Sequence, residues 1–129
     1  MTTHTHPRIT IKYCTQCKWL LRAAYFAQEL LSTFGTDLGE VALLPATGGV
    51  FTVTMFVGSE GGVREVVLWD RRLRGGFPEV KVLKSLVRNV IDPSRDLGHT
   101  DRALRAANLD HDAAGEAGED EEKACEDCR

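Results

Sequence analysis

The 129-residue sequence predicts an α/β (α+β) domain in which the elements follow the order β-α-β-β-β-α and the strands form a mixed four-stranded sheet. Three observations predict it: short apolar runs that alternate with polar residues, two segments with helical spacing, and glycines or prolines between these segments. The composition, 43% hydrophobic and 27% charged, is that of a globular domain. No run approaches the roughly 18 apolar residues that span a bilayer, so we expect no membrane partner.

The first half of the chain predicts two parallel strands joined by a helix. Alternation predicts a strand from Ile9 to Tyr13, and helical spacing predicts a helix from Lys18 to Phe34 that ends at Gly35. Residues 40–44 read as the second strand, parallel to the first because a whole helix separates them. The stripe predicted to face the core is Leu20, Ala24, Ala27, Leu31 and Phe34, broadened by Trp19, Ala23, Phe26 and Leu30.

The second half predicts a hairpin and a closing helix. Residues 50–57 alternate as a strand, residues 58–62 form a glycine-rich turn, and residues 63–69 return. A second helix starts within residues 75–79 and ends at Pro93, and Pro45 is expected to be a trans loop proline. The core positions predicted on the second helix are Leu83, Leu86, Val87, Val90 and Ile91.

A cysteine pair, Cys14-Thr15-Gln16-Cys17, stands where the first strand gives way to the first helix. An unperturbed thiol is only about 5% thiolate near neutral pH, and helix-start amides would increase that fraction at a thiol placed there. We therefore expect redox chemistry at Cys14 and Cys17. The alternatives are a structural pair and half of a zinc site, which would need two more ligands.

With the dithiol in the loop after the first strand, the element order is the thioredoxin-like arrangement. Three segments resemble the selenoprotein W-like (Rdx) group within it: residues 13–17, residues 49–53, and Gly76-Phe77-Pro78-Glu79. The resemblance covers about residues 9–99 and implies a small redox protein, linked to glutathione, that acts in redox homeostasis. Many animal members carry selenocysteine where this sequence has Cys17. In thioredoxins the first cysteine of the pair attacks, which favours Cys14. The position of selenium in the family favours Cys17, so the choice of attacking sulfur stays open.

Charge divides the chain into a mildly basic body and an acidic tail. Residues 1–109 carry a net charge of +4 and residues 110–129 one of −7. We predict a flexible N-terminus (1–7), one domain (8–100) and a disordered tail (101–129), because the acidic end lacks large apolar residues. The tail holds a second pair, Cys125 and Cys128, which would act either as auxiliary thiols that exchange with the first pair or as an incidental pair.

Two further features lie near the dithiol or in the predicted loop after the hairpin. The segment from Asp70 to Gly76 carries Arg71, Arg72 and Arg74, which would either contact an anion such as the carboxylates of glutathione or simply be solvated. Trp19 would either form a docking lip or pack into the core.

The function predicted from the sequence is thiol-disulfide redox chemistry with no tightly bound cofactor and with glutathione or protein thiols as partners. The alternatives are a redox-responsive adaptor without turnover, which would bind a protein partner, and a zinc-binding module. Scattered basic residues without a recognition motif predict no nucleic-acid binding. The first seven residues have no apolar signal-peptide centre, so we expect a cytoplasmic protein with reduced cysteines.

Overall fold

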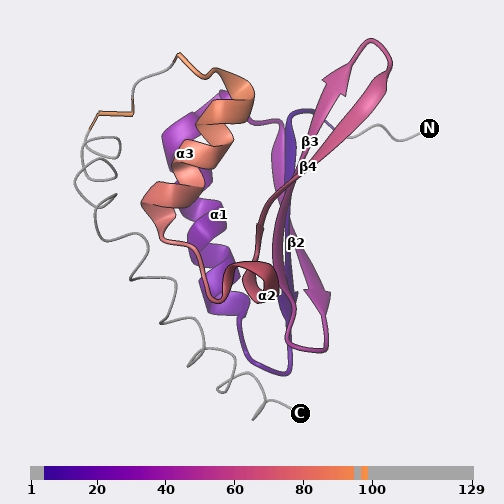
Figure 1. Ribbon diagram of the computed structural model, residues 1–129, viewed down its shortest axis with the longest axis vertical. Helices are drawn as coiled ribbons and strands as arrows, with labels where there is room; N and C mark the ends of the chain where they lie inside the picture. The colour runs from indigo at the N-terminus through magenta and orange to yellow at the C-terminus, as the bar shows by residue number, and fades with distance from the viewer. Residues whose placement is uncertain (1–4, 95–96, 99–129) are drawn as a thin grey trace.

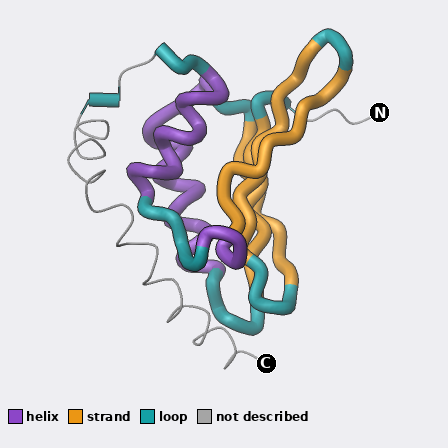
Figure 2. Tube along the Cα trace, viewed as in Figure 1, coloured by secondary structure: helices purple, strands orange, loops and turns teal. Residues whose placement is uncertain are grey.

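The computed structural model describes residues 5–94 and 97–98 as a four-stranded sheet with helices on one of its faces (Figures 1 and 2). The two long helices, α1 and α3, lie side by side over the sheet, while the short α2 sits at one end of it. The strands are β1 (Arg8–Cys14), β2 (Glu40–Ala46), β3 (Phe51–Ser59) and β4 (Gly62–Asp70). The helices are α1 (Leu20–Phe34), the 3-10 turn η1 (Gly35–Asp37), α2 (Arg71–Arg74) and α3 (Val80–Ile91).

The sheet has the order β2-β1-β3-β4, with β1 parallel to β2 and antiparallel to β3. The predicted fold class, element order and mixed sheet are therefore confirmed. The order has one consequence for the site. Because β1 lies between β2 and β3, the link from Ala46 to Phe51 must cross the carboxyl end of β1, where Cys14 is the last residue.

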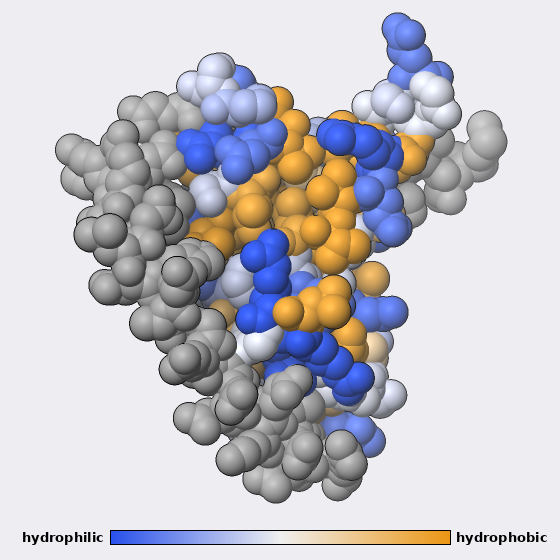
Figure 3. Space-filling model, viewed as in Figure 1, coloured by the Kyte–Doolittle hydropathy of each residue, from blue (hydrophilic) through white to orange (hydrophobic). Residues whose placement is uncertain are grey.

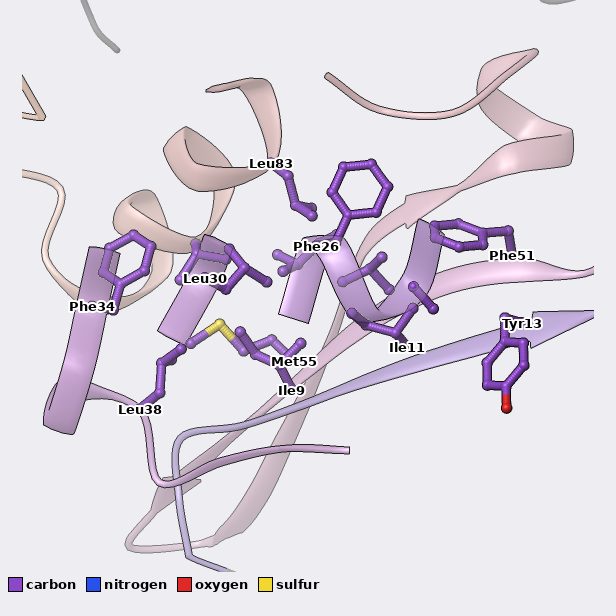
Figure 4. Close-up of a cluster of buried hydrophobic side chains, with 14 residues drawn as sticks. Ile9, Ile11, Tyr13, Phe26, Leu30, Phe34, Leu38, Phe51, Met55 and Leu83 are labelled. Atoms are coloured by element: carbon purple, nitrogen blue, oxygen red, sulfur yellow. The ribbon is translucent and has the colours of Figure 1, made fainter. Parts of the chain in front are cut away.

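The core lies between the sheet and the two long helices (Figure 4). From β3, Phe51, Val53 and Met55 are buried as the alternation predicts. From α3, Leu83 and Val87 are buried. The other three predicted core residues of α3, Leu86, Val90 and Ile91, are partly buried against the cluster, as predicted.

The buried stripe of α1 differs from the predicted one. Its fully buried residues are Ala23, Phe26, Leu30 and Phe34. Leu20 and Leu31, predicted to face the core, are 51% and 42% exposed. The helix is apolar around much of its circumference, so its periodicity does not choose among adjacent stripes. Contact with β1, β2 and α3 makes that choice.

Two loop predictions are revised. Residues 70–76 were expected to be a flexible loop, but residues 71–74 form the helical turn α2. The Asp70 carboxylate accepts hydrogen bonds from the backbone N–H groups of Arg72 and Leu73, which caps that turn. Pro45 lies within β2 rather than in a loop, which an edge strand allows. Its peptide bond is trans as predicted, since the cis bond among the described residues is His6–Pro7.

Within the described part of the chain, no helix is long and apolar enough to cross a membrane. The predicted tail of residues 101–129, including Cys125 and Cys128, lies outside the described residues. So does most of the predicted flexible start, of which only residues 5–7 are described.

Candidate functional site

Three segments meet at one end of the sheet, which we call the dithiol edge. They are the dithiol loop (residues 14–19), the link between β2 and β3 (residues 47–50) and the segment around α2 (residues 70–76). The topology requires this meeting, because β1, β2 and β4 all point the same way and so end at the same edge. The dithiol edge therefore combines residues that are up to about sixty positions apart in sequence.

The dithiol loop is a single turn closed by two nested backbone hydrogen bonds. The Trp19 N–H donates to the Cys14 carbonyl over 3.3 Å, and the Lys18 N–H donates to the Thr15 carbonyl over 3.0 Å. This pair of bonds is the Schellman pattern, which requires a left-handed residue, and here Lys18 takes that place with φ of 61°. The Thr15 N–H and hydroxyl both donate to the Ala46 carbonyl, at 2.8 and 3.0 Å, and tie the loop to β2.

The two cysteines have different surroundings. Cys14 is fully buried at the end of β1, whereas Cys17 is partly exposed. Burial of Cys14 disfavours its thiolate and so raises its pKa. Hydrogen bonds outweigh this effect and lower the pKa of the Cys14 thiol; they come from the Cys17 thiol and from the backbone of Gly49, Cys17 and Gln16. The Cys17 N–H lies 3.4 Å from the Cys14 sulfur. The fold therefore favours the thiolate form of Cys14 more than a free cysteine does.

The source of this stabilisation corrects the sequence-based explanation. The first helix was predicted to begin at Lys18 and to aim its amides at the thiols, but α1 begins at Leu20. The backbone groups that act on Cys14 belong to the dithiol loop and to Gly49 instead. The predicted direction of the pKa change holds for Cys14, with a different cause.

Gly48 and Gly49 form the part of the site that sequence reasoning missed. Both have positive φ, 88° and 71°, a backbone region that side chains with a Cβ disfavour. Two arginines from α2 hold this glycine pair: Arg72 Nη2 donates to the Gly48 carbonyl, and Arg71 Nη2 donates to the Gly49 carbonyl over 3.2 Å. The sequence feature that could have indicated this part of the site is the Gly-Gly pair in the link between β2 and β3, which crosses the end of β1.

Arg71 is the buried polar residue of this edge, with only 2% of its surface exposed. Its guanidinium lies 5.1 Å from the Trp19 ring and 6.0 Å from the Phe77 ring. Trp19 packs edge-on against Phe77 at 4.8 Å and against Phe51 at 6.3 Å. Of the two roles considered for Trp19, core packing is the one observed, and Phe77 of the Gly76-Phe77-Pro78-Glu79 segment packs against it.

The other two arginines of α2 are exposed. Arg74 stacks over Trp69 at 4.9 Å, and the Trp69 indole N–H donates to the Gly76 carbonyl over 2.8 Å. Hydrophilic side chains gather around α2 in the space-filling view (Figure 3). Arg72 and Arg74 can therefore be reached by a dissolved anion, whereas Arg71 is enclosed. A contact of Arg71, Arg72 or Arg74 with glutathione stays a prediction.

A zinc site would need ligands beyond the two cysteines. Among the described residues there is no group of three or more histidine, cysteine, aspartate or glutamate side chains that could hold a metal ion. The chemistry that Cys14 and Cys17 can perform together is the exchange of electrons between a dithiol and a disulfide.

Comparison with known proteins decides the family. The family model described as "Rdx family" matches residues 8–89, more than half of the chain and the whole of the dithiol edge. The chain belongs to the Rdx family. Comparison with curated proteins found no match.

Two solved structures are similar to this Rdx protein. A protein from Bordetella parapertussis is 60% identical, with 66% of this chain and 99% of that chain covered and a TM-score of 0.55. A selenoprotein W-related protein from Vibrio cholerae is 47% identical, with 66% and 96% covered and a TM-score of 0.57. The predicted selenoprotein W-like resemblance is confirmed, and the family and its close cysteine pair mark this Rdx protein as a redox-related thiol protein.

Proposed function

We propose that this Rdx protein is a thiol-disulfide exchange protein whose Cys14–Cys17 pair reacts with glutathione or protein thiols in the cytoplasm. The observation that supports it is the unequal treatment of the two sulfurs. Cys14 is stabilised as a thiolate but enclosed, and Cys17 is partly exposed beside it. One sulfur is thus placed to meet a partner and the other to complete the exchange. The proposal needs no bound cofactor, because the two sulfurs carry both electrons.

In this proposal Cys17 attacks first and Cys14 resolves. The Cys17 thiol donates a hydrogen bond to the Cys14 sulfur, which can take its proton as Cys17 attacks one sulfur of oxidised glutathione. The glutathione disulfide breaks, one glutathione leaves, and a mixed disulfide forms on Cys17. Cys14 then passes this proton to the glutathione thiolate that has left, attacks the Cys17 sulfur as a thiolate and releases the second glutathione.

The exchange balances in atoms and electrons. Two protein sulfurs lose two electrons and form the Cys14–Cys17 disulfide, while oxidised glutathione gains two electrons and becomes two thiols. These thiols take up the proton that Cys17 carried and one proton from water. An excess of reduced glutathione drives the same steps backwards and regenerates the dithiol.

Trapping the mixed disulfide tests this proposal. All proteins carry Cys125→Ser and Cys128→Ser so that tail thiols do not react, and each is mixed with oxidised glutathione, acid-quenched and mapped by peptide mass spectrometry. With Cys14→Ser added we expect one glutathione on Cys17; without it we expect the Cys14–Cys17 disulfide. With Cys17→Ser, the enclosed Cys14 should react far more slowly.

Two results would contradict parts of this scheme. Faster adduct formation on Cys14 in the Cys17→Ser protein than on Cys17 in the Cys14→Ser protein would reverse the two roles. Exchange with neither glutathione nor a small protein disulfide would remove the proposed function itself.

Arg72 and Arg74 extend the proposal to glutathione recognition. Both are exposed on α2 at the dithiol edge, and guanidinium groups pair well with carboxylates. We expect Arg74→Gln to raise the KM for oxidised glutathione several-fold and to leave the reaction with an uncharged small-molecule disulfide unchanged, because Arg74 stacks on Trp69 whereas Arg72 also holds the Gly48 carbonyl. Equal loss with both substrates would assign Arg74 a structural role.

A second candidate function, a redox-responsive adaptor, rests on exposed leucines. Leu21, near the start of α1, is 82% exposed and Leu73 on α2 is 84% exposed. In this version a protein partner covers these side chains and oxidation of Cys14 and Cys17 changes its affinity without turnover. Multiple turnovers with glutathione would favour the exchange protein, and a single stoichiometric oxidation would favour the adaptor.

A further inference from the structure

The peptide unit between Gly48 and Gly49 connects an arginine to the dithiol. Its N–H, on Gly49, acts on the Cys14 sulfur, and its carbonyl, on Gly48, accepts from Arg72. The next carbonyl along, that of Gly49, accepts from Arg71 over 3.2 Å. Side chains of α2 therefore hold the carbonyls of both Gly48 and Gly49. These contacts fix the direction in which the Gly49 N–H points. Hydrogen bonds in such a chain also polarise one another.

Among the described residues, no ion pair supplies a counterion for the charge of Arg71. Its side chain is buried, and its Nε and Nη1 atoms have no hydrogen-bond partner among the described residues. The ion pairs of Arg8 with Glu40 and of Lys84 with Glu29 do not involve it. Its guanidinium also lies over the rings of Trp19 and Phe77, which offset a cation only in part. A buried, poorly paired guanidinium is costly unless another charge balances it.

Among the described ionisable groups around the dithiol, the Cys14 thiolate is the candidate for that charge. Within the dithiol loop these groups are Cys17 and Lys18, and on α2 they are the exposed Arg72 and Arg74. The Asp70 carboxylate is engaged by the backbone of α2, and Arg22 of α1 lies on the Phe77 ring at 3.9 Å. The ends of β2 and β3 nearest to Cys14, Ala46 and Phe51, are uncharged.

We propose that Arg71 is a positioning residue for the dithiol: it fixes Gly49 so that its N–H faces the Cys14 sulfur, and it supplies a buried positive charge that the Cys14 thiolate balances. The inference deepens the proposed function and rests on it for its biological meaning. Its immediate consequence is chemical. Forming the Cys14–Cys17 disulfide removes the negative charge and leaves Arg71 unbalanced, so Arg71 favours the reduced protein and makes the disulfide more oxidising.

The test compares Arg71→Met with Arg71→Lys and with a control, Arg74→Met. The control removes a cation from the same turn that does not touch the glycine pair. Two properties are measured in a background with Cys125→Ser and Cys128→Ser: the thiolate ultraviolet absorbance against pH, and the equilibrium with glutathione against pH. For Arg71→Met we expect the Cys14 titration to move to higher pH and the equilibrium constant to shift toward the disulfide. Each tenfold shift corresponds to about 30 mV.

The remaining variants separate charge from position. Arg74→Met should leave both properties unchanged. Arg71→Lys should restore part of the effect, because it keeps the charge without the planar contact to Gly49. An unchanged Cys14 titration in folded Arg71→Met would overturn the proposal. So would a shift of equal size in Arg74→Met, because the effect would then be general surface charge.

A measurement on the cysteine-substituted parent protein keeps the inference testable if Arg71→Met does not fold. The Gly49 amide resonance and the Arg71 Nε resonance are followed by NMR through the pH titration and on oxidation. Both should shift with the same midpoint as the thiolate absorbance, and both should move again when the disulfide forms. Resonances that stay constant while Cys14 titrates would overturn the proposal.

These readouts are independent of turnover. Failure of the proposed function would appear as absent exchange with glutathione or a protein disulfide while the Cys14 titration still depends on Arg71. Failure of the present inference would appear as normal exchange with a Cys14 titration that ignores Arg71.

Discussion

The core and the dithiol edge of this Rdx protein are built by opposite means. The core lies between regular strands and helices, and its members are apolar residues such as Ile9, Leu30 and Leu83. The dithiol edge contains left-handed residues at Lys18, Gly48 and Gly49 and a buried arginine, two of whose nitrogens have no hydrogen-bond partner within residues 5–94 and 97–98. The contrast indicates that the core contributes stability while the edge directs backbone N–H groups at a sulfur. Changes in the core should therefore alter stability, and changes at the edge should alter sulfur chemistry.

The largest expected effect on stability comes from Leu83→Ala in the core. Leu83 is fully buried, so removing its side chain should lower the free energy of unfolding by about 2–5 kcal/mol, measured by urea denaturation of the reduced protein. Leu73→Ala is the matched control, because the same change at an 84% exposed position should stay within about 0.5 kcal/mol. A shift of the Cys14 titration in natively folded Leu83→Ala would contradict the claim that changes in the core leave the sulfur chemistry of the dithiol edge unaltered.

The second effect is a pH dependence of stability that belongs to Cys14. Folding lowers the pKa of the Cys14 thiol. The contribution of Cys14 to the free energy of unfolding is therefore complete above the pKa of an unfolded thiol, about 8.5, and is lost as pH falls through the pKa of the folded protein. Between the two values, the free energy of unfolding should rise with pH by roughly 1.4 kcal/mol per unit. Denaturation of the reduced protein from pH 5 to 9 measures it. Cys14→Ser should lack this rise, and an identical slope in that variant would show another group to be responsible.

A smaller effect is expected at the left-handed residue of the dithiol loop. Lys18 has φ of 61°, which costs a residue with a Cβ about 1 kcal/mol or somewhat more. Lys18→Gly should therefore raise the free energy of unfolding by about 1 kcal/mol, reduced by the extra freedom glycine has when unfolded. Lys18→Ala is the control and should bring no such gain, since its Cβ remains. Equal stabilisation by both variants would trace the effect to the lysine side chain instead of the backbone.

The smallest effect is expected from removing residues 110–129. The described groups that act on Cys14, namely Cys17, Gly49 and Gln16, lie within the segment that matches the family model, so the truncated protein should keep the Cys14 titration and the exchange rate with glutathione. The comparison is made with Cys125→Ser and Cys128→Ser in the full-length chain, which removes the tail thiols and keeps its charge. A several-fold loss of turnover in both would show that the tail pair exchanges with the first pair. A loss on truncation alone would assign the effect to the tail charge.

The sequence predicted the regular elements well because each carries its own periodic signal. Phe51, Val53 and Met55 alternate along β3, and Leu83 and Val87 repeat at helical spacing along α3; both sets are buried as predicted. The failure in α1 has the same origin. With apolar residues on several adjacent stripes, the pattern does not distinguish Leu20 and Leu31 from Ala23 and Leu30, and only packing against the sheet does.

The dithiol edge was predicted only in part. Cys14 and Cys17 were identified from their spacing and their place after the first strand. The expected source of thiolate stabilisation was wrong, because the donating groups include Gly49, which lies thirty-five residues after Cys14. Arg71 was expected in a flexible loop. Its burial depends on the rings of Trp19 and Phe77, which no local pattern places together.

The sequence by itself determined the order of strands and helices, the position of the dithiol at the end of the first strand, and the apolar alternation of β3. These properties follow from local spacing, since side chains two or about 3.6 residues apart share a face. Only the tertiary structure decided which sulfur is stabilised and by what. The order β2-β1-β3-β4 carries Gly48 and Gly49 across the end of β1 and brings α2 beside them, and contacts between segments so distant in sequence leave no periodic mark on any one of them.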